Sequence, residues 1–437
     1  MLKPLQLAPV ALILILPLGA QGIQGGRSSL GATAGTAPIA DPCERLVGLP
    51  VGADVNDLAL LSGALLLDTF GPGNQALNLG GIGQVARLHW TDAASARAGS
   101  IILLQSGVLF SELNFSAGPS ESVGCGSTGP VSAEQCTAAF YDGTPTQGEY
   151  DDQSMLATIA IDDLPPPLDG RQTIVAVIDT GIDPTHPSFA GGIAGPGFDF
   201  LTNSVGGYDI PNGIDDDRDG VIDEAYGHGT HVSGIIRVVD PSALLLPYRV
   251  LNSEGNGTAF DVARAIYQAE IDGAQIINLS LGLARVSLAV NGALEGVTEN
   301  GLVVIASAGN TGRMGVGALA ANDETIAVAA VDDQGILAPF ATYGSEVDVV
   351  APGVGIYSAM PGGQYAWWSG SSMSTAVVTG AVSRLRASSV DANQEEAEDA
   401  LGDGGIEVDD LNPGRDGLLG EGIIHLGLAL QELLEDS

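Results

Sequence analysis

The chain has 437 residues, of which 45% are hydrophobic, and this is enough for the core of one large domain and a smaller unit. Such a content of apolar residues excludes a globally disordered chain. There are 53 acidic and 15 basic residues, a formal net charge of −38. An acidic surface excludes nucleic acid as a partner, because nucleic-acid binding needs a basic footprint.

Residues 1–20 have the pattern of a signal peptide. Lys3 is followed by an apolar run that is too short for a spanning helix and ends near small residues. No other stretch of the sequence is long and apolar enough to cross a membrane. We therefore expect a secreted or otherwise extracytoplasmic protein that has no membrane attachment after the signal is cleaved.

The three cysteines are Cys43, Cys125 and Cys136, an odd number for an exported protein. Cys125 and Cys136 enclose a loop that contains glycine and serine, and they could form a disulfide. Cys43 would then be left over, unless the segment that carries it is removed. The alternative is three free thiols.

The hydrophobic pattern divides the rest of the chain into a small unit, a linker and a large unit. Residues 43–117 are expected to form a small α+β domain, residues 118–148 a linker rich in Gly, Ser, Thr and Pro, and residues 149–437 the large domain. The small domain is predicted to contain strands at Arg45–Leu49, Leu65–Phe70 and Val108–Phe115, and helices at Val55–Ser62 and Ala93–Leu104.

In the large domain, the β-branched run from Ile174 to Ile178 ends at Asp179 and Gly181. A run of this kind predicts a buried parallel strand. Asp179 would stand at its carboxyl end, where open α/β sheets place their functional sites. The fold class expected for this domain is α/β.

Two further residues complete a catalytic set with Asp179. His228 lies between two glycines at the start of a helix of small residues. Ser372 follows a small-residue turn, and the run from Met373 to Leu385 after it predicts a buried helix, whose amino end favours negative charge. Each motif alone could be an ordinary helix cap. Together, Asp179, His228 and Ser372 are the orienting acid, general base and nucleophile of a triad.

Asn310 supplies a fourth element of the same chemistry. It directly follows a predicted strand that begins at Val303. Its side-chain amide could donate a hydrogen bond to the oxyanion of a tetrahedral intermediate.

With these four motifs in this order, the chain resembles the subtilisin family of serine endopeptidases, the subtilases, in which the triad also runs Asp, His, Ser. The resemblance implies a three-layer doubly wound parallel sheet, polypeptide substrates, an acyl-enzyme intermediate, no organic cofactor and a monomer. Two residues depart from the family pattern. Ser374 stands where the family usually has Ala, and Ala376 where it usually has Pro.

The resemblance also suggests a role for the small domain. The segment Val108–Phe115 is similar to the last strand of subtilase propeptides. A propeptide would assist folding, act as an intramolecular inhibitor and be cut away within the linker by the enzyme itself, together with Cys43. The alternative is an accessory domain that stays attached.

The family further implies where the substrate binds. An extended peptide would pair as an added strand between two segments of the enzyme. Such binding depends more on hydrogen bonds to the peptide backbone than on contacts with its side chains. The residues implied are Gly255, Asn256 and Gly257 on one side, and Ser280, Leu281 and Gly282 on the other.

The segment 213–224 has the beginning of a calcium-binding loop. Acidic residues at alternate positions, followed by a glycine at the sixth, suit a hard cation in a sharp turn. Position twelve is Tyr226 and not Glu, so the ligand shell must be completed differently, and the alternative is an acidic solvated turn. The predicted ligands of a structural Ca²⁺ are Asp215, Asp217, Asp219, Val221 and Asp223.

Two other functional classes remain open on the sequence alone. A non-catalytic binding protein of this family would be expected to have a broken triad, and none of the positions Asp179, His228, Asn310 and Ser372 is broken. A protease that processes a single partner, without broad digestion, is compatible with the same residues.

Overall fold

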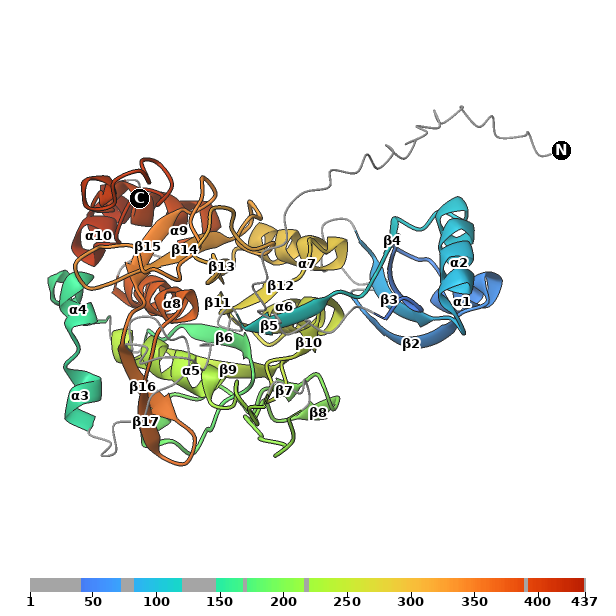
Figure 1. Cartoon of the computed structure of the whole chain (residues 1–437), viewed down its shortest axis with the longest axis horizontal. Coiled ribbons are helices and arrows are strands. Elements are labelled where there is room, and N and C mark those ends of the chain that lie inside the picture. The colour runs from blue at the N-terminus through green and yellow to red at the C-terminus, as the bar shows by residue number, and fades with distance from the viewer. Residues whose placement is uncertain are drawn as a thin grey trace, which may run out of the picture. The chain divides into compact units, whose positions relative to one another are not determined.

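The structure is a computed structural model, and it describes residues 41–71, 82–119, 147–167, 171–215, 220–388 and 392–435 (Figure 1). All of these residues belong to one unit of the chain, Gly35–Ser437. The expected signal peptide, both cysteines of the suggested disulfide (Cys125 and Cys136) and two predicted calcium ligands (Asp217 and Asp219) lie outside the described residues.

The N-terminal part is a four-stranded antiparallel sheet in the order β2-β3-β1-β4, with two helices. The carboxylates of Asp54 and Asp92 cap the amino ends of these helices by accepting backbone N–H groups. Val47, Leu88 and Leu103 are buried between sheet and helices. The elements are β1 (Glu44–Leu49), α1 (Val55–Ser62), β2 (Leu65–Phe70), β3 (Gln84–His89), α2 (Ala93–Gln105) and β4 (Phe110–Glu112).

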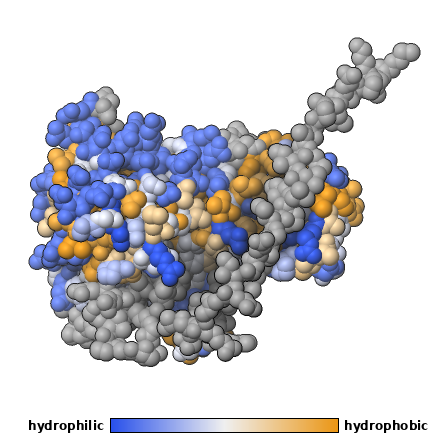
Figure 2. All heavy atoms as spheres, turned by 45° about the horizontal axis from the view of Figure 1, so that its top comes forward, coloured by the Kyte–Doolittle hydropathy of each residue, from blue (hydrophilic) through white to orange (hydrophobic). Residues whose placement is uncertain are grey.

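The two helices of this part are apolar on their outer face as well. Leu60 on α1 is 81% exposed and Ile101 on α2 is 58% exposed. Figure 2 shows apolar side chains at the surface of this part of the molecule, at the right of the view. Its apolar residues are thus only partly used in its own core.

The single strand predicted at Val108–Phe115 is wrong in its extent. The chain forms β4 (Phe110–Glu112), breaks, and then forms β5 (Ser116–Pro119), which pairs in a different sheet. Asn114 lies at the break. Its Nδ2 donates to Glu44 Oε1 in the N-terminal sheet (2.6 Å), while its Oδ1 accepts the N–H of Phe260 at the start of another helix (3.0 Å). Since this residue bonds to both parts, the strand cannot continue straight through it.

The large sheet has eight strands in the order β15-β14-β13-β11-β6-β9-β7-β8, and all neighbours except β7 and β8 are parallel. It confirms the predicted α/β class. Its strands are β6 (Ile174–Asp179), β7 (Phe198–Asp199), β8 (Ser204–Val205), β9 (Leu244–Arg249), β11 (Ile276–Leu279), β13 (Val303–Ser307), β14 (Ile326–Val331) and β15 (Val349–Pro352).

Helices cover both faces of this sheet, and the alternation of side chains along β6 shows which face is which. Val175 and Val177 pack in one cluster with residues of α5 (His228–Val239) and α8 (Ser371–Ser388). Ala176 and Ile178 pack in the opposite cluster with α6 (Ala259–Ile271) and α7 (Leu288–Glu299). Asp179 continues the series of Val175 and Val177, so it faces the layer that contains α5 and α8.

The remaining elements surround this three-layer core. They are α3 (Gln147–Asp151), α4 (Ser154–Thr158), β10 (Gly257–Thr258), β12 (Leu281–Leu283), β16 (Ile356–Met360), β17 (Gln364–Trp368), α9 (Gln394–Asp403) and α10 (Leu426–Glu435), with short 3₁₀ turns at Ile161–Asp163, Pro187–Phe189 and Asp409–Leu411. Within the described ranges, no helix combines the length and the apolar character that crossing a membrane requires.

Acidic residues repel one another where α9 lies near the start of β15. Burial, with the charges of Asp348 and neighbouring acids, raises the pKa of Glu398 to about 7. Burial likewise raises the pKa of Asp348 to about 6. Both values lie above the ordinary range near pH 4. A raised carboxyl pKa means that the folded state binds protons more tightly, so the contribution to stability is largest below pH 4 and is lost as the pH rises through about 6 to 7.

We therefore expect Glu398→Gln to raise the melting temperature at pH 8 by about 1–3 °C and to leave it nearly unchanged at pH 4. The effect is modest because the carboxyl is partly exposed to solvent, which screens its interactions. Thermal unfolding at both pH values measures it. Glu295→Gln, at an exposed position of α7, is the matched control. An equal shift at pH 4 and pH 8 would contradict the assignment.

Candidate active site

The site begins at the carboxyl end of β6, where Asp179 is fully buried. Asp179 Oδ1 accepts the N–H of Thr180 (2.6 Å), which fixes the carboxylate against the turn that follows. Gly181 in this turn has a φ of +102°, and a Cβ there would lie 2.5 Å from the backbone of Tyr208. Only glycine allows the two segments to pass this close.

His228 is the first residue of α5 and is 1% exposed. Its Nδ1 lies 2.8 Å from Asp179 Oδ1 and 3.0 Å from Oδ2. Because an ionised carboxylate only accepts, this contact assigns the proton of the neutral ring to Nδ1 and leaves Nε2 as the basic nitrogen. The ring of Trp368 meets the imidazole edge to face, with centroids 5.3 Å apart. The carboxylate and the indole together hold the imidazole in one orientation.

Ser372 lies in the first turn of α8, fully buried. Its Oγ donates to the carbonyl of Ser280 (3.0 Å), which lies between β11 and β12. The amino end of α8 presents backbone N–H groups and the positive end of the helix dipole at this point. The helix predicted from Met373 to Leu385 is therefore confirmed and extends beyond that range at both ends.

Asn310 lies beside the same helix end. Its Oδ1 accepts the N–H of Ser371 (2.9 Å). Since the amide oxygen makes this bond, the amide nitrogen is on the other branch of the side chain and is the donor that suits an oxyanion. Ser371 Oγ also contacts Ser307 Oγ (2.5 Å), so the end of β13 and the start of α8 are joined directly.

One departure from the family pattern has a clear structural role. Ser374 Oγ donates to the carbonyl of Ala351 on β15 (2.9 Å). A Cβ at Gly353 would lie only 2.1 Å from that hydroxyl, so glycine there makes room for serine. Ala376 is buried in the cluster shared by α5 and α8, and the helix continues through it.

The two segments expected to bind substrate are the outer strands of a three-stranded antiparallel sheet, order β10-β5-β12. The middle strand is β5 of the N-terminal part. Ala117 pairs with Gly257 on one side and with Leu283 on the other, and Pro119 pairs with Leu281. An extended segment of the chain thus occupies the space between the two edges.

The predicted substrate-binding segment Gly255–Gly257 is only partly a strand. Gly255 and Asn256 form a turn in which Gly255 N donates to the carbonyl of Asn252 and Asn256 N donates to Asn252 Oδ1. Only Gly257 and the following residue enter β10. The carbonyl of Gly255 still lies over Gly118, where an added Cβ would be 3.2 Å away.

Two residues of the N-terminal part cap helices of the large domain. Glu112 accepts hydrogen bonds from Ser287 Oγ (2.7 Å) and from the N–H groups of Leu288 (2.9 Å) and Ala289 (3.1 Å) at the start of α7. Asn114 accepts the N–H of Phe260 in α6. Carboxylate and amide oxygens at helix amino ends are stabilising because those N–H groups have no partner within the helix.

A third contact joins β2 to α6. The ring of Phe70 meets that of Phe260 edge to face, with centroids 5.4 Å apart. The carboxylate of Asp68 forms an ion pair with Arg264 (3.3 Å). The sequence gives no signal for these contacts, because they join residues far apart along the chain.

Two other histidines, His186 and His231, are buried and have structural roles. His186 Nδ1 accepts the N–H of Ser188, and its Nε2 contacts the carbonyl of Gln364 (2.9 Å). His231 Nε2 lies 3.1 Å from the carbonyl of Ala366. Complete burial lowers the pKa of His231 to about 3, so this ring is neutral at ordinary pH.

The acidic loop before His228 is described only in part. Asp215 Oδ2 accepts the N–H of Gly220 (3.1 Å), and Gly220 has a φ of +100°, a conformation that favours glycine. Asp223 accepts the N–H groups of Asn212 (2.8 Å) and Gly213 (2.9 Å). Within the described ranges, no three acidic, histidine or cysteine side chains lie together as metal ligands would.

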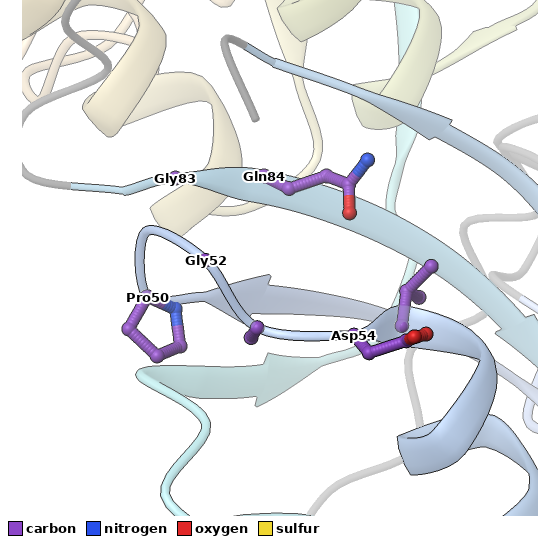
Figure 3. A pocket seen from close by; sticks show the side chains of 7 residues that line it. Pro50, Gly52, Asp54, Gly83 and Gln84 are labelled. Atoms are coloured by element: carbon purple, nitrogen blue, oxygen red, sulfur yellow. The ribbon is translucent and has the colours of Figure 1, made fainter. Parts of the chain in front are cut away.

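A cavity of about 350 Å³ lies away from these residues. Its walls come from the turn after β1 and the start of β3, and they include Pro50, Asp54 and Gln84 (Figure 3). The carboxylate of Asp54 already caps α1. None of the residues of the candidate triad lines this cavity.

Comparison with known proteins decides the family. The family model described as "Subtilase family" matches residues 170–403, which include Asp179, His228, Asn310 and Ser372. The chain belongs to the subtilase family. Subtilases as a family are serine-type endopeptidases.

The relatives of this subtilase include a thermophilic serine proteinase of Bacillus sp. (strain AK1), 39% identical over 48% of this chain and 51% of the relative. Thermitase of Thermoactinomyces vulgaris is 37% identical over 50% of this chain and 76% of its own length. Among solved structures, a protease from Pseudoalteromonas arctica aligns with a TM-score of 0.58 and 25% identity, covering 67% of this chain and 100% of that one. The match thus spans about half of the first relative and about three quarters of thermitase.

Proposed function

We propose that this subtilase is an exported serine endopeptidase, made as a zymogen, that hydrolyses peptide bonds with Asp179, His228 and Ser372. The observation that carries the proposal is the buried contact between His228 Nδ1 and Asp179, with Ser372 in the first turn of α8. A non-catalytic binding protein would have no need to bury a carboxylate against a histidine, because burying a charge is costly unless it is paired.

The reaction follows from the roles of these groups. His228 Nε2 takes the proton of Ser372 Oγ as the oxygen attacks the peptide carbonyl, and Asp179 stabilises the imidazolium that forms. His228 then gives the proton to the leaving amine, and water hydrolyses the acyl-enzyme by the same steps in reverse order. The amide nitrogen of Asn310 and the N–H of Ser372 bind the oxyanion. Loss of the corresponding asparagine in subtilisin, a member of this family, lowers turnover by about 10²–10³-fold.

We further propose that the small domain expected at residues 43–117, extended to Pro119 because β5 continues past residue 117, is a propeptide that inhibits the enzyme. Support comes from β5, which fills the space between the two substrate edges with its backbone paired on both sides. β5 ends at Pro119, which pairs with Leu281, and the carbonyl of the neighbouring Ser280 accepts Ser372 Oγ (3.0 Å). Self-cleavage should therefore fall just after Pro119, between residues 119 and 122. Residues 120–148 would then be the leftover linker, and residues 149–437 the peptidase domain.

The decisive experiment compares the wild-type chain with Ser372→Ala by intact mass spectrometry during incubation. The wild type should lose a segment that ends between residues 119 and 122, and Ser372→Ala should stay intact. A model peptide substrate should be cleaved by the wild type only. Cleavage at the same position in the purified Ser372→Ala protein would refute self-processing by Ser372.

A second prediction concerns the cap on α7. Glu112→Ala removes the acceptor for two backbone N–H groups and one hydroxyl, and this should weaken the bound propeptide by about 1–2 kcal/mol, roughly 5- to 30-fold. After cleavage, full activity should then appear sooner, which is measured as a shorter lag in peptide hydrolysis. Asp57→Ala, at an exposed site of α1, is the control and should keep the wild-type lag. An unchanged lag in Glu112→Ala would contradict an inhibitory role for this contact.

We also propose that the acidic loop at residues 213–224 binds a structural Ca²⁺. The carboxylates of Asp215, Asp217 and Asp219 with the main-chain carbonyl of Val221 would supply hard oxygen ligands. Support comes from the hydrogen bond between the N–H of Gly220 and the carboxylate of Asp215, which brings the two described ends of the acidic run together. Asp223 was also predicted as a ligand, but its carboxylate already accepts the N–H groups of Asn212 and Gly213. We therefore leave Asp223 out of the ligand set and propose that it holds the two ends of the loop together.

The calcium proposal predicts a metal-dependent melting temperature. In the Ser372→Ala background, which excludes self-digestion, Ca²⁺ at about 100 times its dissociation constant should add about 2.7 kcal/mol and raise the melting temperature by about 5–10 °C over an EDTA-treated sample. Asp215→Asn should remove most of this difference. Asp332→Asn, in a surface turn where the carboxylate also accepts two backbone N–H groups, should retain it. Equal melting temperatures with Ca²⁺ and with EDTA would overturn the assignment.

A further inference from the structure

Asp209 lies where the chain enters the segment that separates β8 from the catalytic histidine. Its N–H donates to the carbonyl of Ile182 (3.1 Å), and Tyr208 forms a parallel bridge with the same residue. Ile182 is in the turn that follows Asp179. The backbone at Asp209 is therefore anchored to the segment that holds the catalytic carboxylate.

The side chain of Asp209 reaches the other end of that segment. Its Oδ2 accepts the N–H of Gly227 (2.8 Å) and the hydroxyl of Thr230 (3.2 Å). Gly227 is the N-cap residue of α5, has a φ of +96° and makes no side-chain cap of its own. Asp209 thus caps the amino end of α5, although it lies 18 residues before the N-cap residue Gly227 in the sequence.

Thr230 links this cap to the turn after Asp179. It is fully buried, and its Oγ1 accepts the N–H of Asp183 (3.0 Å) while donating to Asp209. One chain of hydrogen bonds therefore runs from Asp183 through Thr230 to Asp209 and on to Gly227. His228 directly follows Gly227, so the start of α5 is tied to the turn that carries its catalytic partner.

The second oxygen of Asp209 is unusual. Oδ1 is buried and has no hydrogen-bond partner among the residues that the structure describes. Burial raises the pKa of Asp209 well above its ordinary range, and the negative charge of Asp179 adds to this, while the Gly227 N–H, Thr230 and the positive charge of Arg249 oppose it. Burying a carboxyl group with one oxygen unpaired costs free energy of folding. This cost indicates that Asp209 has a role other than stabilising the fold.

We propose that Asp209 is a positioning residue for the catalytic base. It fixes the first turn of α5 so that the His228 imidazole meets Asp179 at hydrogen-bonding distance and presents Nε2 to Ser372. It touches neither substrate nor the reacting atoms and acts through Gly227 and Thr230. The inference rests on the proposed peptidase function, because it assigns Asp209 a part in that reaction.

The test compares Asp209→Ala with Asp209→Asn. Alanine removes the acceptor for Gly227 and Thr230, whereas asparagine keeps one oxygen for both bonds. Asp209→Ala should lower kcat for a peptide substrate by about tenfold, with KM within about twofold, because the loss is in the alignment of the base and not in substrate binding. Asp209→Asn should keep at least about a third of the wild-type kcat. Asp272→Ala is the control, since this carboxylate also accepts two hydrogen bonds, from Tyr248 and Gln268, outside the site.

Two further measurements keep the test decisive. Thr230→Val is nearly isosteric, so it removes one bond to Asp209 even if Asp209→Ala fails to fold, and it should lower kcat about threefold or more. In the Ser372→Ala background, the NMR signal of the His228 Nδ1–H proton should shift or broaden with Asp209→Ala and stay in place with Asp209→Asn. This signal needs no catalysis, so it tests the positioning of His228 even if the wild type proves not to be a peptidase.

The outcomes separate the two proposals. Wild-type kcat in both Asp209→Ala and Thr230→Val, or an Asp209→Asn variant as impaired as Asp209→Ala, would overturn the role of Asp209 and leave the peptidase function standing. An inactive wild type would overturn the peptidase function, and the His228 signal would then support or refute the positioning role by itself.

Discussion

The buried pairing of Asp179 with His228 is the constraint on which the rest of this structure depends. A carboxylate that is completely removed from water is tolerated only when hydrogen-bonding partners lie close to it. The carboxyl end of β6 must therefore lie next to the amino end of α5 in space, so that His228 reaches Asp179. The glycines around the pair follow from this closeness. A Cβ at Gly229 would lie 2.2 Å from the carbonyl of Gly181 and 3.1 Å from the Asp179 carboxylate. The parallel sheet then brings the ends of β11 and β13 to the same edge, where α8 delivers Ser372.

Much of this arrangement could be predicted from local patterns. The strand β6 and the helix α8 are marked by largely apolar runs, so Asp179 at the end of one and Ser372 at the start of the other could be placed from the sequence. The order of the motifs then supplied the family. The alternation of carboxylates in the acidic loop was likewise visible, because the groups concerned are near neighbours in the sequence.

What could not be predicted are the contacts between distant segments. Nothing in the residues around Asp209 or Glu112 indicates that each caps a helix far along the chain, since capping is recognised in a sequence only when the cap adjoins its helix. The break at Asn114 was missed for the same reason. The pattern from Val108 to Phe115 favours one strand, but the side chain of Asn114 bonds to two different parts of the fold and ends the pairing there.

The position of β5 has a consequence for the lifetime of the enzyme. This strand lies in the middle of the sheet that it shares with β10 and β12, and the caps on α6 and α7 come from residues just before it. Under the processing proposed above, the peptidase domain without residues up to 119 would have to keep its fold without contacts that were present when the fold formed. Its stability would then be kinetic, set by the height of the barrier to unfolding. A molecule that unfolded would lack the segment that assisted its folding and would not refold. Such a protein is better described by a half-life than by an equilibrium constant.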